Sequence, residues 1–253
     1  MPDHRTARRR APSVVGLACL LAGTGVLVSA QAGAATENGT QLLRSAIAAT
    51  KAASSARVVG DVVQKNQTTS LDLSAATNDH GQGSVTVNGQ QIKLIRLGPT
   101  VYMSASNKFW SQSVSPTAAQ LFAGKWIAGP VTNKDFASLG KFLDYPTLMN
   151  QLLGGAASSV VYAGTTTYQG RKVTVLKNKP SGGSGTGTVY VAASGQPYIL
   201  RISQTGGSSN GTITFSAYNV QPNPSAPQGS INFEQLTNPT PSSTTTAPIQ
   251  SSP

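Results

Sequence analysis

Short runs of alternating apolar and polar residues, interrupted by turn-forming residues, constrain the fold of this chain more than any other feature. Four such runs follow one another between residues 57 and 105. Asn88-Gly89 separates two of them, and these residue types readily adopt the positive φ angles that a two-residue hairpin turn requires. Val85 and Val87 then share one face of the hairpin. The pattern predicts a meander of antiparallel strands.

A second series of strand-like runs lies between residues 158 and 220, with turns predicted at Gln169-Gly170 and Gly195-Gln196. About two hundred residues lie between the start and the tail of the chain, which is enough for one substantial core. We find no internal repeat of 20 to 50 residues. The two series therefore belong to a single domain.

Helical patterns precede and separate the two series of strands. Residues 40–56 repeat apolar side chains with the period of a helix. Ser115 is placed to cap a second helix, with Pro116 in the first helical position. Two further short helices are expected in residues 133–155. The predicted fold class is α+β, with an antiparallel sheet and a few short helices.

The first 34 residues have the three parts of an export signal: an arginine-rich start, an apolar stretch and small residues at a cleavage site. Cleavage after Ala32 or Ala34 leaves a chain that begins at Gly33 or Ala35. Cys19, the only cysteine, lies within the apolar stretch and is removed with it. We therefore expect a secreted protein, located outside the cytoplasmic membrane.

Two alternatives for this segment stay open. A lipid anchor on Cys19 would tie the protein to a membrane, but residues 20–28 after it stay apolar, and Gly16 stands where such signals usually have leucine. An uncleaved membrane helix would use residues 14–35, which is close to the ~20 residues that span a bilayer. The pattern of small residues favours cleavage. The predicted segments are a signal peptide (1–34), a folded domain (35–236) and a disordered tail rich in proline, serine and threonine (237–253).

The chain is basic, with a formal net charge of +11. Without residues 1–34 it retains 15 basic and seven acidic residues, a net charge of +8. The basic residues are scattered singly and form no run that would follow a phosphate backbone, so we expect no nucleic acid partner. Two interpretations remain: attraction to an anionic membrane or wall surface, or a basic surface that only keeps the protein soluble. We expect a monomer.

Catalytic constellations are absent from the sequence. His80, the only histidine after cleavage, lies beside Asp79 in a turn-like stretch. A Ser-His-Asp arrangement is conceivable, but the sequence has no nucleophile motif. A solvated loop histidine is therefore favoured. The remaining carboxylates include no close pair, and metal ligands do not cluster. Residues 181–187 are as glycine-rich as a phosphate-binding loop but lack the Lys-Ser/Thr pair and the helix that should follow. We expect no catalytic residues, no metal, no cofactor and no enzyme activity.

The order of helix, strands, helices and strands, in an exported chain of this length, resembles the lipoprotein-carrier superfamily. The most specific matches are VTVNGQQIKLIRLGPTVYMSASNKFWSQ and TTTYQGRKVTVLKN followed by VYVAASGQPYILRIS. The superfamily includes LolA-like periplasmic carriers and the LppX-like and LprG-like lipid-transfer lipoproteins of actinobacteria. The resemblance covers residues 40–235. It departs from the membrane-attached members at the poor lipidation signal around Cys19, so the free carriers are nearer analogues.

The resemblance implies a curved, incompletely closed antiparallel sheet, a half-barrel wrapped around helices, whose apolar gap takes up the acyl chains of a lipid or of an acylated protein. Burying acyl chains would contribute about 0.8 kcal/mol per methylene group. The competing interpretation is an extracellular or wall-associated interaction module with a filled core and no ligand. Ordinary core packing is likewise the alternative for each candidate residue of the acyl cavity: Leu94, Tyr102, Phe109, Trp110, Phe122, Trp126, Leu148, Leu152, Val161, Val175, Val191, Leu200, Ile202 and Phe215.

The two tryptophans receive the most weight, because large aromatic residues with a polar edge often lie at a pocket mouth. Trp110 and Trp126 flank one predicted helix in the sequence, and we expect them to flank one opening in space. Residues 115–155 would then form a lid, with glycine-containing loops that flex when a long chain enters.

Overall fold

The computed structural model describes residues 33–112, 114–154, 160–178, 185–207 and 209–237. The predicted signal peptide and tail lie outside these ranges, apart from residues 33, 34 and 237. The strands are β1 (Ser55–Gln64), β2 (Gln67–Ala76), β3 (His80–Val87), β4 (Gln90–Leu97), β5 (Thr100–Ala105), β6 (Ile127–Pro130), β7 (Val160–Tyr168), β8 (Arg171–Asn178), β9 (Thr186–Ala192), β10 (Ile199–Thr205), β11 (Ser209–Ser216) and β12 (Ile231–Asn232). The helices are α1 (Gly33–Ala52), α2 (Asn107–Trp110), α3 (Pro116–Phe122), α4 (Lys134–Gly140), α5 (Tyr145–Leu153) and α6 (Phe233–Thr237).

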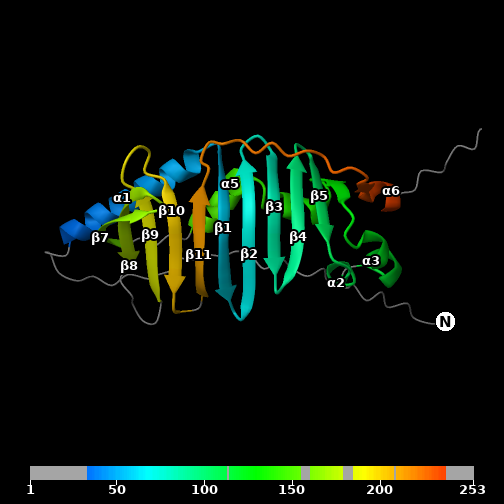
Figure 1. The fold of residues 1–253 in the computed structure, drawn as a ribbon, viewed down its shortest axis with the longest axis horizontal. Coiled ribbons are helices and arrows are strands. Elements are labelled where there is room, and N and C mark those ends of the chain that lie inside the picture. Colours follow the sequence, from blue (N-terminus) through cyan, green and yellow to red (C-terminus); the bar gives the residue numbers. More distant parts are fainter. Residues whose placement is uncertain (1–32, 113, 155–159, 179–184, 208, 238–253) are drawn as a thin grey trace, which may run out of the picture.

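All these strands form one open, curved sheet in the order β12-β6-β5-β4-β3-β2-β1-β11-β10-β9-β8-β7 (Figure 1). Strands β1 to β5 are consecutive neighbours, and so are β7 to β11. Pairing of β1 with β11 joins the two meanders at the middle of the sheet, where Val58 lies opposite Phe215. The short β12 pairs with β6 in parallel, and the other pairs are antiparallel. The predicted α+β class is confirmed.

Two predicted hairpin turns are present. Asn88 and Gly89 connect β3 to β4 with φ angles of 49° and 78°, the left-handed region that this turn requires. Gln169 and Gly170 connect β7 to β8 in the same way, with φ angles of 48° and 75°. These turns fix the register of both hairpins, so that Val85 lies opposite Ile92.

The predicted helices are found with altered ends. Ser115 caps α3 by accepting a hydrogen bond from the Ala118 amide, as the sequence indicates. The helix predicted for residues 40–56 is wrong at its end, because α1 stops at Ala52 and Ser55 already pairs with Ala76 in the sheet. Trp110, which precedes α3 in the sequence, lies in a further short helix, α2.

One face of the sheet, here called the helix-side face, contains the hydrophobic core. Val58, Leu73 and Leu94 lie on this face and pack in the same cluster as Leu43 of α1 and Leu148 of α5. Figure 1 shows both helices behind the sheet. The helices cover the sheet separately: α1 packs against β7 and β10, α5 against α1 and β2, and α4 against β5 and β6.

The opposite face, here called the open face, is polar. Arg57 and Lys93 are exposed on it, and Asp72, Ser84 and Lys93 lie opposite one another across β2, β3 and β4. None of the helices described lies in front of this face in Figure 1. The alternation of apolar and polar residues along the strands thus separates a packed face from a solvated one.

Glycines occupy helix-side positions in the central strands. A Cβ atom added at Gly60 would meet the carbonyl oxygen of Thr212 and would lie 2.8 Å from the Cα atom of Ile213. A Cβ atom at Gly83 would meet β2 in the same manner, 2.8 Å from the Cα atom of Leu73. The backbones of adjacent strands approach too closely here for any side chain, which lets the sheet curve toward the helices.

Candidate functional site

Helix α1 is held to the sheet and to α5 through Thr50. The Thr50 hydroxyl accepts a hydrogen bond from the Ile199 amide at 3.0 Å, and its carbonyl accepts one from the hydroxyl of Tyr145. Tyr145 is fully buried, and this burial raises the pKa of its hydroxyl above the ordinary value. The Tyr218 hydroxyl donates to the Ile199 carbonyl. These bonds fix the position of α1 and α5 on the helix-side face.

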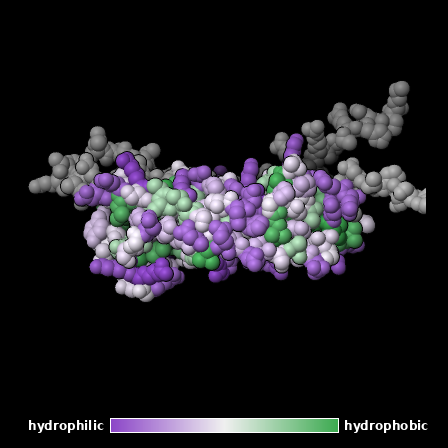
Figure 2. Space-filling view, turned by 90° about the horizontal axis from the view of Figure 1, so that it is seen from above, coloured by the Kyte–Doolittle hydropathy of each residue, from purple (hydrophilic) through white to green (hydrophobic). Residues whose placement is uncertain are grey.

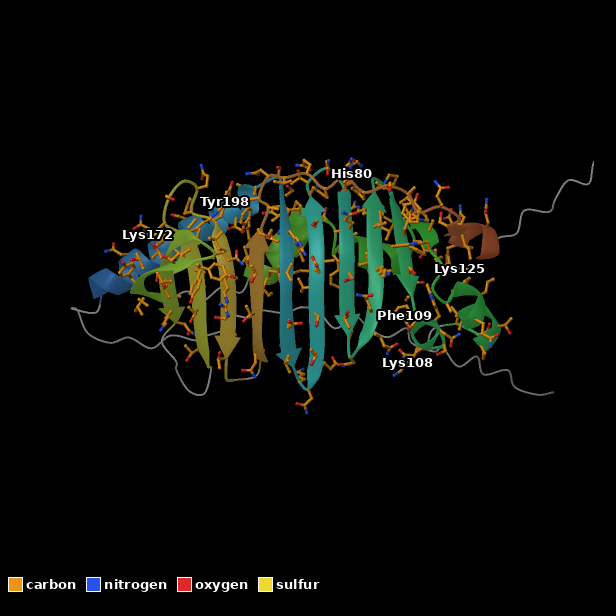
Figure 3. The ribbon with its side chains drawn as sticks, in the orientation of Figure 1. His80, Lys108, Phe109, Lys125, Lys172 and Tyr198 are labelled. Atoms are coloured by element: carbon orange, nitrogen blue, oxygen red, sulfur yellow. The ribbon has the colours of Figure 1, made fainter. Side chains whose placement is uncertain are left out.

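The start of α5 is fixed by ion pairs. The Arg96 guanidinium lies 2.7 Å from Asp79 and 3.5 Å from Asp144. Asp144 in turn caps α5 by accepting a hydrogen bond from the Thr147 amide at 2.9 Å. Asp79 is therefore ion-paired with Arg96. His80 is the first residue of β3 and lies at the upper edge of the sheet in Figure 3.

An aromatic cluster joins α2 and α3. The ring centroid of Trp110 lies 5.4 Å from that of Phe109 and 5.2 Å from that of Phe122, both in edge-to-face arrangements. Trp110 is only 6% exposed, and its indole N–H has no hydrogen-bond acceptor among the described residues. A buried donor without an acceptor costs about 1–3 kcal/mol, so this N–H is a site where a bound acceptor would be stabilised.

Most candidate residues of the acyl cavity lie on the helix-side face. The following belong to the buried core cluster: Leu94, Trp110, Phe122, Leu148, Leu152, Val191, Ile202 and Phe215. Phe109 is partly buried and packs against it. These nine residues come from both meanders and from the helical insert, so the structure brings them together between the sheet and its helices. Their role in binding acyl chains stays a prediction.

The other candidates lie elsewhere. Tyr102 alternates with Val101 and Met103 of the core, so it lies on the open face, as does Trp126 before the core residue Ile127. Val161 and Val175 also alternate with core positions and lie outside the cluster, and Leu200 is buried at an irregularity of β10. Strand alternation places Trp126 on the open face, whereas Trp110 of α2 packs in the buried core cluster, so the structure puts the two tryptophans in different surroundings.

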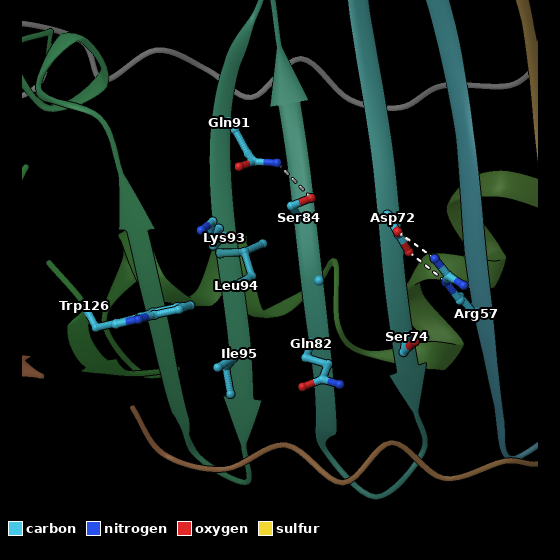
Figure 4. A pocket seen from close by; sticks show the side chains of 11 residues that line it. Arg57, Asp72, Ser74, Gln82, Ser84, Gln91, Lys93, Leu94, Ile95 and Trp126 are labelled. Atoms are coloured by element: carbon cyan, nitrogen blue, oxygen red, sulfur yellow. Dashed lines mark hydrogen bonds and ion pairs between the residues drawn. The ribbon is translucent and has the colours of Figure 1, made fainter. Parts of the chain in front are cut away.

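The open face contains a trough of about 480 Å³, shown in Figure 4. Its lining residues are Arg57, Asp72, Ser74, Gln82, Gly83, Ser84, Gln91, Lys93, Leu94, Ile95 and Trp126. Arg57 and Asp72 form two hydrogen bonds, Nε to Oδ1 at 2.9 Å and Nη2 to Oδ2 at 2.8 Å. The hydrogen bond from Arg57 lowers the pKa of the Asp72 carboxyl below its ordinary value. Sequence reasoning missed this site, because its residues gather only once the strand register is known.

Charges and apolar side chains are dispersed over the surface. Lys108 and Lys125 lie toward one end of the molecule and Lys172 toward the other (Figure 3). The large apolar side chains that are exposed belong to separate segments: Val63, Leu121, Tyr162 and Val220. Figure 2, a view from above, likewise shows hydrophobic patches separated by hydrophilic residues.

The described part of the chain contains neither a metal-binding group nor a membrane-spanning helix. His, Cys, Asp and Glu side chains there form no group that could hold a metal ion. No helix of that part has the length and apolar character that crossing a membrane requires.

Comparison with known proteins identifies solved structures with a similar fold. No family model matches the chain. No curated protein matches it either. The crystal structure of LprF from Mycobacterium bovis matches with a TM-score of 0.50 and 18% identity, over 76% of this chain and 99% of LprF. This chain has an LppX/LprG-like fold. The structure of the lipoprotein LppX from Mycobacterium tuberculosis matches with a TM-score of 0.45 and 18% identity, over 74% of this chain and 98% of LppX. The open, curved sheet and the match with LprF confirm the half-barrel expected from the sequence.

Proposed function

We propose that this protein is an exported carrier that holds the acyl chains of a lipid, or of an acylated protein, between the sheet and its helices. The observation that supports the proposal most is the helix-side face, a long apolar surface covered by short helices that pack on different strands. Helix α4 rests on β5 and β6, whereas α1 and α5 contact each other, so α4 can move without breaking strand pairs. An acyl chain inserted there gains about 0.8 kcal/mol for each methylene group removed from water.

The aromatic cluster adds a polar contact to this proposal. A lipid ester has a carbonyl oxygen next to its acyl chain, and the Trp110 indole N–H is a buried donor without a partner in the described structure. A carbonyl placed against Trp110 would satisfy this donor while the chain lies along Phe109 and Phe122. The head group would then lie at the end of the molecule that carries α2 and α3.

Native mass spectrometry of the protein purified from its own host tests the proposal. We expect a mature chain that begins at Gly33 or Ala35, with a noncovalent adduct of lipid mass that dissociates on activation. A fluorescent acylated probe should bind the delipidated protein. Absence of both copurified lipid and probe binding would reject carriage and favour the interaction module with a filled core. A diacylated peptide containing Cys19 would contradict the free, secreted form.

Binding of lipid is expected to change the helical insert more than the sheet. A Trp126→Phe variant leaves Trp110 as the only emitter, since the chain has two tryptophans. Adding lipid to this variant should shift its emission spectrum, and hydrogen exchange should slow in residues 115–154 more than in β3 and β4. A Trp110→Phe variant serves as the control, with emission from Trp126 on the open face. An unchanged insert together with unchanged Trp110 emission would place the entrance elsewhere.

A further inference from the structure

The trough on the open face is elongated across the strands. It extends from Arg57 on β1, through β2, β3 and β4, to Trp126 just before β6 (Figure 4). Strands β1 and β6 are five interstrand spacings apart, or about 24 Å at ~4.8 Å per spacing. The backbones that hold the lining residues cover this distance, and a trough of about 480 Å³ across them suits an extended ligand that lies across several strands.

Most of the side chains in the trough are uncharged and have free hydrogen-bonding capacity. Ser74, Gln82 and Lys93 have no side-chain hydrogen bond within the described residues, and Gln91 donates only a long bond of 3.4 Å to Ser84. Amides and hydroxyls both donate and accept hydrogen bonds. A ligand with many hydroxyl groups is the chemical class that such a mixed surface satisfies.

The charges in the trough do not favour an anion. Arg57 is neutralised by two hydrogen bonds to Asp72, so Lys93 is the cation of the trough that has no anionic partner in the described structure. An anion site would present several converging donors that are not already engaged by a carboxylate. The lining is also too polar for an acyl chain. Lys93 alone does not form such a site, so the uncharged amides and hydroxyls of the lining, rather than its charges, indicate the class of ligand.

Trp126 supplies an aromatic surface at one end of the trough. It is half-buried, and in Figure 4 its side chain extends across the neighbouring strand toward β4. An indole presents a broad apolar face to a partner that is polar at its edge. The ring of a sugar has this character, since its C–H groups form an apolar face and its hydroxyls point outward.

We propose that the open-face trough binds a neutral glycan, with one sugar ring against Trp126 and with hydroxyls hydrogen-bonded by Gln82, Ser74 and the Asp72 carboxylate. The proposal goes beyond carriage of acyl chains and does not depend on it, because the two sites lie on opposite faces of the sheet. The glycan would be either a free polysaccharide or the sugar head group of a glycolipid. The chemistry of recognition is the same for both.

Titration calorimetry of the full mature protein tests this site with a panel of neutral tetrasaccharides built from glucose, mannose or galactose. At least one member is expected to bind, and Trp126→Ala should weaken that binding at least tenfold. Gln82→Ala should weaken it about threefold. Thr188→Ala, on the open face of β9 and outside the trough, is the matched control and should bind as the parent does. Thermal unfolding of each variant confirms that it is folded.

Further binding measurements identify the source of the ligand and exclude other ligands. Inorganic phosphate is expected to leave the heat of mixing unchanged, and binding of phosphate in place of the sugars would overturn the proposal. Glycolipid vesicles with the same head groups are compared with free oligosaccharides. Binding of both probes that depends on Trp126 supports a polysaccharide as the ligand. Binding of the vesicles alone, again dependent on Trp126, supports the head group of a glycolipid. Binding of no probe, or binding that Trp126→Ala leaves unchanged, would overturn the proposal.

Discussion

Replacing Tyr145 with alanine is expected to lower the free energy of unfolding by about 4 kcal/mol, as for other large aromatic residues removed from a core. Tyr145 is fully buried at the start of α5, and its hydroxyl donates to the carbonyl of Thr50 in α1. The substitution both opens a cavity and removes the Tyr145 bond to this carbonyl, which keeps only the long bond of 3.4 Å from the Ala53 amide. Urea unfolding followed by circular dichroism measures the change.

Tyr145→Phe separates the two contributions. It keeps the ring and removes the hydroxyl, so we expect a smaller loss of about 1–3 kcal/mol. A loss below 1 kcal/mol for Tyr145→Ala would show that α1 and α5 are not held together by this contact. The acylated probe should still bind Tyr145→Phe, since the aromatic cluster of α2 and α3 is unchanged.

Replacing Gly60 with alanine is expected to destabilise the protein by about 3 kcal/mol, at the upper end of overpacking effects. The added methyl group would meet the backbone of β11 at Thr212 and Ile213. Backbone atoms cannot move aside as a flexible side chain can, so the pairing of β1 with β11 has to open. Thermal unfolding of the variant measures the loss.

Gly98→Ala is the matched control for Gly60→Ala. Gly98 has a φ angle of +58° and open space around its Cβ position, so alanine there is disfavoured by backbone conformation alone. We expect a cost of about 1 kcal/mol for this change. Equal destabilisation by the two substitutions would contradict the steric argument for Gly60.

The elements that local chemistry specifies were predictable from the sequence. Asn88-Gly89 indicated its turn because few residues accept two successive positive φ angles. Ser115 and Pro116 indicated the start of α3 because a hydroxyl cap and a fixed φ angle both favour that position. Each signal lies within a few residues, so no information about distant parts of the chain was needed.

Features that depend on distant parts of the chain were not predictable. In β5, Val101, Tyr102 and Met103 are all apolar or aromatic, so the sequence does not show which of them faces the helices. The same ambiguity applies to Trp126, which was predicted to line the acyl cavity but lies on the open face. The register of β5 with β4 and β6 decides these faces, and β6 is separated from β5 in the sequence by α2 and α3. The trough was missed for this reason too, because its residues come from four strands and the segment before β6.

The pairing of β1 with β11 also has a consequence for the order of folding. β1 is complete by Gln64, yet its partner begins only at Ser209, so one side of β1 has unpaired backbone groups until nearly the whole domain is available. Such a long-range contact slows folding and leaves an exposed strand edge in the meantime. A chain threaded through a membrane from its N-terminus would therefore join its two meanders only after β11 has emerged, so the late hairpin of β10 and β11 is the step that covers the exposed edge of β1.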